Sequence, residues 1–223
     1  MFSWLPKNVS TFGGDVDSIL YLIYYIVAIW FVLTYAAIIY CLIRYRRRPG
    51  RKARYVDGNS LRQYGWILGL GVVVLLLDIG IDVRGEQVWQ KVKGHLPKPG
   101  VQVQVTGKQF IWEVVYPGPD GVFSTPDDHR LNGELHVPVN QVVHVKLKAE
   151  DVIHSFFLPH LRLKQDAMPG HTLTLWFEAT EPGVYPIPCA ELCGSGHTGM
   201  LGQLTVHTPE TYDAWVKQQW PAS

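Results

Sequence analysis

Two long apolar segments dominate the first hundred residues. The first, Ile19 to Ile43, carries no charge and is rich in Ile, Leu, Val, Ala and Tyr. As a helix it would be about 37 Å long at 1.5 Å per residue, enough to cross a hydrocarbon core of roughly 30 Å with some tilt. The basic run Arg44 to Arg48 follows it, and no small-residue cleavage site is seen. The pattern therefore predicts a retained membrane anchor rather than a signal peptide.

The second apolar segment runs from Tyr64 to Val83 and contains two acids, Asp78 and Asp82. Residues four apart share one face of a helix, here near its far end. Carboxylates inside a membrane usually face protein or water, so a functional role and a polar edge of the span are both open interpretations. Because no proline or glycine-rich break follows, the helix is expected to continue as far as Lys93.

After a linker from Gly94 to Gly100, the apolar residues recur with a period of two. Turn-forming residues such as Pro117 to Gly121 separate the alternating runs. Short alternating runs with turns between them predict the strands of a β-sandwich or small barrel, extending from Val101 to Val206. A proline and acids then open a short helix, Pro209 to Gln219. The clearest alternating runs are 101–106, 143–148 and 173–177.

Charge gives the orientation of the two spans. The net charge of +1 hides an uneven distribution. Residues 1–100 hold 13 Lys/Arg and 6 Asp/Glu, whereas residues 101–223 hold 7 Lys/Arg and 13 Asp/Glu. Residues 44–62 alone hold eight Lys/Arg and one acid, Asp57. The positive-inside rule places this loop in the cytoplasm, and the N-terminus and β domain on the periplasmic or intermembrane side. Nucleic-acid binding is excluded because the basic residues crowd into a short loop instead of covering a folded face.

Composition agrees with this organisation. The 223 residues are 47% hydrophobic and 17% charged, below the usual charged share of about 25%, which excludes a disordered or fibrous chain. Four regions are expected. They are an outer N-terminal segment at 1–17, a membrane hairpin at 18–94 with its cytoplasmic loop 44–62, a β domain at 95–207 and a helical tail at 208–223.

The richest group of metal-ligand types lies between Cys189 and Met200. This segment contains two cysteines, one histidine and one methionine, and the third cysteine of the chain, Cys41, lies inside the first span. Thiolate, imidazole and thioether ligands together favour copper over hard cations. Small residues would let the loop fold around a metal: Ala190, Gly194, Ser195, Gly196 and Gly199.

Three simpler interpretations compete with a two-copper site. A disulfide between Cys189 and Cys193 suits an oxidising compartment but leaves His197 and Met200 without a role. Structural zinc usually takes Cys-x2-Cys pairs and no methionine. A type 1 copper site uses one cysteine as a ligand, so the second cysteine would have no role.

Two cysteines bridging two copper ions would use both thiols, with one histidine as terminal ligand of each ion. The second histidine must then come from elsewhere in the chain. His154 is a polar residue at the expected end of a strand, is followed by an apolar pair, and is only weakly favoured over His160. The expected strand histidines His136, His144 and His171 are interpreted as solvated.

With these residues in view, the chain resembles subunit II of haem–copper cytochrome c oxidase over essentially its whole length. The matching features are the two-span hairpin, the segments 151–156 and 163–170, and Cys189-x-Glu191-x-Cys193-x3-His197-x2-Met200. The resemblance implies a cupredoxin-like Greek-key sandwich that holds a binuclear copper A centre. It implies Cys189 and Cys193 as bridges, His154 and His197 as terminal ligands, Met200 as a weak ligand, and the carbonyl of Glu191 as a further ligand. It also implies a magnesium ion bound by the Glu191 carboxylate and shared with subunit I.

The same resemblance implies the function. The chain would be one subunit of a proton-translocating oxidoreductase in the inner respiratory membrane, without a complete active site of its own. In the family, cytochrome c or a cytochrome c domain gives electrons to copper A, which passes them to haem in subunit I for reduction of oxygen to water and proton pumping. The sequence has no Cys-x-x-Cys-His motif, so the cytochrome must be a separate chain, and haem belongs only to partners. Further expected partners are other oxidase subunits and membrane lipid. The alternatives are a membrane-anchored periplasmic copper carrier and a quinol oxidase-type subunit II.

Two positions depart from the family pattern. Phe110 stands where family members often accept electrons through a tryptophan, so Phe110 and Trp112 are the expected positions at which electrons enter the chain. Gln63 stands where the family often has a glutamate at the mouth of a proton path. Acids of the β domain are expected to form a face that attracts a basic cytochrome: Glu113, Asp120, Asp127, Asp128, Glu134 and Asp151.

Overall fold

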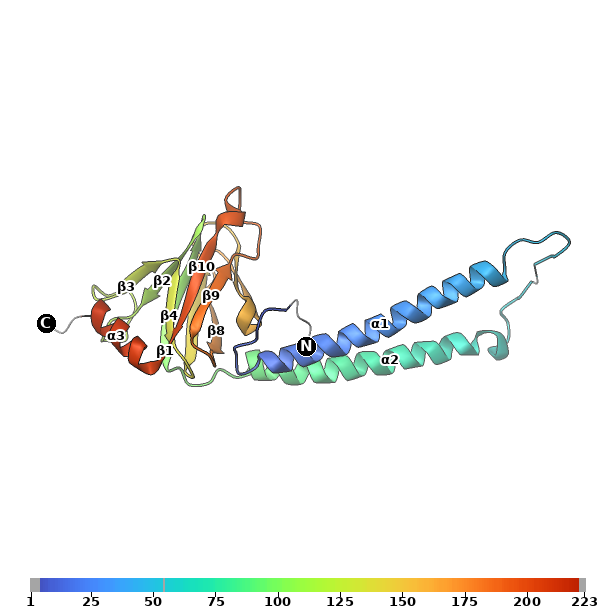
Figure 1. The fold of residues 1–223 in the computed structure, drawn as a ribbon, viewed down its shortest axis with the longest axis horizontal. Helices are drawn as coiled ribbons and strands as arrows, with labels where there is room; N and C mark the ends of the chain where they lie inside the picture. Colours follow the sequence, from blue (N-terminus) through green and yellow to red (C-terminus); the bar gives the residue numbers. More distant parts are fainter. Residues whose placement is uncertain (1–4, 54, 221–223) are drawn as a thin grey trace. The chain divides into compact units, whose positions relative to one another are not determined.

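A computed structural model of the chain describes residues 5–53 and 55–220. Residues 15–90 form one compact unit, a hairpin of the helices α1, Gly13–Arg44, and α2, Leu61–Trp89 (Figure 1). Both helices are long and apolar enough to cross a membrane. The π-helical turn η1, Gln90–Gly94, directly follows α2, so the predicted extension to Lys93 is confirmed.

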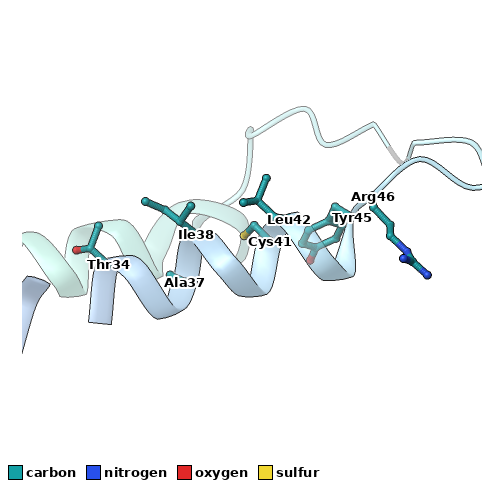
Figure 2. A pocket seen from close by; sticks show the side chains of 7 residues that line it. All are labelled: Thr34, Ala37, Ile38, Cys41, Leu42, Tyr45 and Arg46. Carbon is teal, nitrogen blue, oxygen red and sulfur yellow. The ribbon is translucent and has the colours of Figure 1, made fainter. Parts of the chain in front are cut away.

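The hairpin is antiparallel, and an ion pair joins the beginning of α1 to the last part of α2. Arg84 Nη2, near the end of α2, lies 3.5 Å from Asp15 Oδ1 in the first turn of α1. Most of the remaining exposed surface of both helices is apolar, which suits lipid or other membrane subunits. Asp78 and Asp82 of α2 are exceptions, since both are exposed. The last turns of α1 and the two residues that follow it line a mostly apolar groove of about 570 Å³. Figure 2 shows Cys41 in this groove with Ile38 and Leu42.

The N-terminal segment packs against the β domain. Residues 5–14 belong to the same compact unit as residues 91–220. The Val9 amide donates to the carbonyl of His160 at 2.9 Å, and the Thr180 amide donates to the carbonyl of Val9 at 2.8 Å. The side chain of Phe12 is 0% exposed and meets the Trp176 ring edge-on at 5.3 Å. The segment therefore adds two buried apolar residues to the core.

Phe12→Ala is expected to destabilise this unit by about 3–5 kcal/mol, because a buried phenylalanine leaves a cavity when truncated. Urea unfolding of the full-length chain in detergent, followed by near-UV circular dichroism, measures the change. Phe31→Ala is the control, since Phe31 is 58% exposed on α1. Equal unfolding midpoints for the two variants would show that the segment contributes no core.

The β unit is a sandwich whose main sheets follow the predicted alternation. A five-stranded sheet has the order β3-β2-β1-β5-β8, and a three-stranded sheet has the order β4-β10-β9. Strands β6 and β7 form a separate pair. The strand bounds are β1 Val101–Lys108, β2 Ile111–Tyr116, β3 His129–Asn132, β4 Glu134–Pro138, β5 Val142–Ala149, β6 His154–Leu158, β7 Leu163–Ala167, β8 Leu173–Glu178, β9 Gly183–Pro188 and β10 Leu201–His207.

The pleat explains which residues form the core. Successive side chains on a strand point to opposite faces, and in β5 the apolar Val143, Val145 and Leu147 are fully buried. The intervening His144 and Lys146 are half-buried. Pairing of β1 with β5 is parallel, whereas β1 with β2 and β5 with β8 are antiparallel. The three predicted alternating runs are thus adjacent strands of one sheet.

The C-terminal helix α3, Pro209–Gln219, has the predicted bounds. The Thr208 hydroxyl accepts the Thr211 amide and so caps the first turn. Trp215 of α3 stacks on the His136 ring with a centroid distance of 4.8 Å, and His136 Nδ1 lies 2.9 Å from His207 Nε2. These aromatic contacts dock α3 on strands β4 and β10.

The interpretation of the strand histidines as solvated is therefore wrong in part. His136 is half-buried beneath Trp215, and His144 Nε2 donates to the carbonyl of Pro97 at 2.8 Å. His171 is exposed but lies between β7 and β8 rather than on a strand. Alternation alone does not show that a polar face of a sheet is covered by a helix or linker.

Candidate metal centre

The predicted ligands meet because β6, β9 and β10 converge. Cys189 directly follows β9, and Met200 directly precedes β10. Antiparallel pairing of these strands continues to the two residues, with the Cys189 amide donating to the Met200 carbonyl at 3.0 Å. An isolated bridge between Phe156 and Cys189 brings β6, whose first residue is His154, against the same place.

The ligand atoms divide into two halves, one around each cysteine sulfur. Cys189 Sγ lies 4.0 Å from His154 Nδ1 and 3.2 Å from the carbonyl oxygen of Glu191. The two sulfur atoms are 3.9 Å apart. The ligand atoms of His154, Cys189 and Cys193 all lie within 4.8 Å of one another.

The second half surrounds Cys193. Its sulfur lies 3.6 Å from His197 Nδ1, in the 3₁₀ turn η3, His197–Gly199, and 3.8 Å from Met200 Sδ. Each sulfur thus has a nitrogen partner of its own and one weaker ligand. This donor set fits two soft metal ions that share both sulfur atoms, which is the chemistry of copper.

The simpler interpretations fit this geometry less well. Cys189 and Cys193 are free thiols, and their 3.9 Å separation is far from a disulfide bond of about 2.0 Å. A structural zinc site would leave the sulfur of Met200 without a role although it faces Cys193. His160, the weaker histidine candidate, contacts the Lys7 carbonyl at 3.0 Å and takes no part in the cluster.

Both cysteines of the cluster are buried, and burial affects the protonation of the Cys193 thiol. Cys189 and Cys193 are 8% and 3% exposed. Burial, together with the neighbouring Cys189 sulfur, raises the pKa of the Cys193 thiol to about 11. The thiol is therefore protonated at neutral pH until a cation displaces its proton, so metal binding releases protons.

Asp151 orients the His154 ring by contacting Nε2, the ring nitrogen that does not face Cys189. Its Oδ1 lies 2.7 Å from His154 Nε2, and it also accepts the backbone amides of Val152 and Gln109. Partial burial acts to raise the pKa of Asp151, but the hydrogen bonds from His154 and the two amides outweigh it and lower the pKa to about 2. The ionised carboxylate fixes the proton on Nε2 and leaves Nδ1 as the ligand atom facing Cys189.

The two residues predicted to receive electrons occupy different environments. Trp112 is 1% exposed, and its ring meets His154 edge-on at 5.9 Å and Phe156 at 5.3 Å. Its indole nitrogen donates to the Ile187 carbonyl at 3.2 Å. Phe110 is 36% exposed and lies against Gly196 of the cysteine loop. Of the two, only Phe110 presents a ring to solvent.

The acids expected to attract a cytochrome are engaged in several separate contacts. Glu113 lies 3.2 Å from Lys108 Nζ, and Asp128 lies 3.9 Å from Arg130. Glu134 contacts His136 at 3.3 Å, and Asp151 supports His154. Neighbouring cations therefore offset part of the negative charge of the predicted acidic face.

Sequence reasoning missed two residues at the site. Gly107 of β1 lies so close to His154 that an added Cβ would be 2.8 Å from the ring, and the Gln109 side chain donates to the Cys193 carbonyl at 2.5 Å. Neither residue is near the cysteines in sequence. Only the packing of β1 against β6 and the cysteine loop reveals them.

Comparison with known proteins agrees with the fold. A sequence model of the family described as "Cytochrome C oxidase subunit II, periplasmic domain" matches residues 101–205. Cytochrome c oxidase subunit 2 of Synechocystis sp. is 32% identical over 98% of this chain and 76% of its own length. This chain belongs to the cytochrome c oxidase subunit II family. The subunit 2 of Thermostichus vulcanus is also 32% identical, over 96% of this chain and 78% of its own length.

A solved structure extends the likeness to the β unit. The periplasmic domain of cytochrome oxidase subunit II from Bradyrhizobium japonicum is 31% identical and aligns with a TM-score of 0.50, covering 56% of this chain and 96% of that one. The predicted architecture, two membrane-spanning helices followed by a cupredoxin-like sandwich, is confirmed. As a member of this family, the chain is a subunit of a haem–copper oxidoreductase and lacks the oxygen-reduction site itself.

Proposed function

We propose that this subunit receives electrons from cytochrome c through a binuclear copper A centre and passes them to haem in subunit I. The proposed ligands are His154, Cys189, the Glu191 carbonyl, Cys193, His197 and Met200. The observation that carries the proposal is the pair of sulfur atoms 3.9 Å apart, each with its own imidazole nitrogen.

When bound, the two copper ions would supply a centre that gains and loses one electron. The protein's contribution is rigidity. A backbone hydrogen bond to Met200 holds Cys189 in place, and the neighbouring Ala190 amide donates to the Ser155 carbonyl at 3.0 Å. His154 is fully buried and fixed by Asp151. Ligands anchored in this way move little when the charge of the centre changes, which favours fast electron transfer.

Copper analysis and EPR spectroscopy of the purified full-length chain test this assignment. We expect two copper ions per chain and, in the mixed-valence state, an unpaired electron coupled to two copper nuclei. One copper ion per chain, or coupling to a single nucleus, would contradict the binuclear centre.

The proposal also assigns residues that contact subunit I and the cytochrome. The Glu191 carbonyl faces Cys189 while its side chain is exposed, so the carboxylate can bind a magnesium ion shared with subunit I. Phe110, exposed beside the cysteine loop, is the proposed contact of the cytochrome. Trp112 supports His154 from within the core.

We further propose that the β unit lies on the periplasmic side and the loop 44–62 in the cytoplasm. Residues 5–14 and 91–220 form one unit, and they lie at the outer ends of the two helices. Both must therefore be on the same side of a membrane that the helices cross. The eight basic residues of the loop favour the cytoplasm for the opposite side.

Protease added to intact spheroplasts is expected to digest the β unit and to spare the loop around Arg51. Lysed spheroplasts are the control, because there the loop should also be cut. Cleavage of the loop with protection of the β unit in intact spheroplasts would reverse the orientation.

A further inference from the structure

Gln109 connects the two halves of the candidate metal centre. Its backbone amide donates to Asp151 Oδ2 at 2.7 Å, and its side-chain amide donates to the Cys193 carbonyl at 2.5 Å. Asp151 in turn holds His154 at 2.7 Å. A continuous chain of hydrogen bonds therefore runs from His154 through Asp151 and Gln109 to Cys193.

The residues joined in this way are far apart in sequence. Gln109 is 42 residues from Asp151 and 84 residues from Cys193. His154 begins β6, whereas Cys193 lies in the loop between β9 and β10. Apart from the metal ions themselves, the separation of these two ligands depends on contacts that cross between the segments.

Close packing strengthens the connection. A Cβ at Gly194 would lie 2.7 Å from Gln109 Nε2, and one at Gly196 would lie 2.4 Å from the Phe110 ring. Gly194 also has φ of +132°, a conformation that other residues rarely adopt. The cysteine loop therefore rests directly on the 109–110 turn, and only glycine permits this approach.

We propose that Gln109 is a positioning residue of the metal centre, and that it fixes Cys193 relative to the His154–Cys189 half. This inference rests on the proposed copper function. The amide of Gln109 also places the positive end of a dipole beside the backbone of a sulfur ligand. Because the reduced centre is more negative than the oxidised centre, such a dipole favours reduction, and its loss lowers the reduction potential.

Gln109→Met in the full-length chain tests the proposal, because methionine keeps the length of the side chain and lacks the N–H donor. We expect two copper ions at saturation, an affinity about 10- to 100-fold weaker, a lower reduction potential and an altered EPR hyperfine pattern. Gln109→Glu should have a larger effect, since its carboxylate would face the Cys193 carbonyl oxygen. If Gln109 only filled space, Gln109→Met and Gln109→Glu would affect the centre to the same extent.

Gln203→Met is the matched control. Gln203 is exposed on β10, the strand that follows the cysteine loop, and its side-chain amide contacts Thr205 Oγ1 at 3.4 Å. This variant should match the unsubstituted chain in copper affinity, potential and EPR. Asp151→Asn weakens the other end of the same chain of hydrogen bonds and should weaken copper affinity as Gln109→Met does. It should raise the reduction potential rather than lower it, because it removes a negative charge beside His154.

The outcomes separate this inference from the proposed function. If the unsubstituted chain does not bind two copper ions, the proposed function fails, whatever the variants do. If it binds two and Gln109→Met behaves like Gln203→Met in affinity, potential and EPR, only the positioning role is overturned. If Gln109→Met does not fold, an unchanged centre in Asp151→Asn overturns it instead.

Discussion

Cys193→Ser is expected to eliminate the two-metal centre and to slow cytochrome c oxidation by the assembled oxidase more than 100-fold. Changes in outer contacts of a metal site typically cost roughly 10- to 100-fold, and this change removes a direct ligand. The sulfur of Cys193 lies within 3.6 Å of His197 Nδ1 and 3.8 Å of Met200 Sδ, so both lose the atom that would tie their metal to the other half. A serine hydroxyl is a poor substitute for a thiolate in binding a soft metal.

The rate of oxidation of reduced cytochrome c by the purified complex, with copper content and EPR of the same sample, measures this effect. Cys41→Ser is the matched control because Cys41 lies in α1, within the first span, and it should behave like the unsubstituted protein. A Cys193→Ser complex with two coupled copper ions and an ordinary rate would remove Cys193 from the ligand set.

Gly107→Ala is expected to displace His154 and to weaken copper binding at least about 10-fold, although it adds a single methyl group. The new carbon would lie 2.8 Å from His154 Cδ2 and 2.9 Å from Cγ, closer than such atoms can approach. The ring cannot easily retreat, because it is fully buried between Trp112 and Asp151. Overpacking of this kind typically costs about 1–3 kcal/mol in the free energy of unfolding.

Copper affinity, EPR and the urea midpoint of the full-length chain measure both parts of this prediction. Gly199→Ala is the control, since Gly199 lies within the cysteine loop and an added Cβ there has no neighbour within 4 Å. If Gly107→Ala keeps the EPR spectrum and stability of Gly199→Ala, the close contact with His154 does not restrict the ring.

Local sequence was sufficient for most elements of the fold. The uncharged segment Ile19 to Ile43 lies within α1, the three alternating runs are β1, β5 and β8, and Pro209 to Gln219 is α3. These patterns depend on residues two to four positions apart, which is the range over which a helix or a strand repeats. The membrane topology follows from loop charge in the same local way and stays a prediction.

The N-terminal segment shows where local patterns fail. Residues 5–14 carry too few apolar residues to show a period, and the sequence predicts a separate outer segment. In the structure Val9 and Phe12 are buried against the β unit. A short segment of this kind has no core of its own, so its place depends on a surface built by residues more than 140 positions away.

The candidate metal centre likewise contains some residues that local sequence patterns reveal and others that they do not. The spacing of Cys189, Cys193, His197 and Met200 was visible in the sequence because one loop carries all four residues. The chemistry of its sequence neighbours separates His154 from His160 only weakly, and the family resemblance selects His154. The roles of Gly107 and Gln109 in holding the ligands had no local signal at all.

By itself, the sequence determined the two spans, the strands, the charge of the loop and the ligand types of the cysteine segment. Only the tertiary structure decided how Asp151 and Gln109 connect the two halves, how closely Gly107 approaches His154, and that Trp112 is buried. The physical reason is that secondary structure and loop motifs arise from neighbours along the chain, whereas these contacts arise from strand register. Register places β1, β6 and the β9–β10 loop together, and it is fixed by the packing of the whole sandwich.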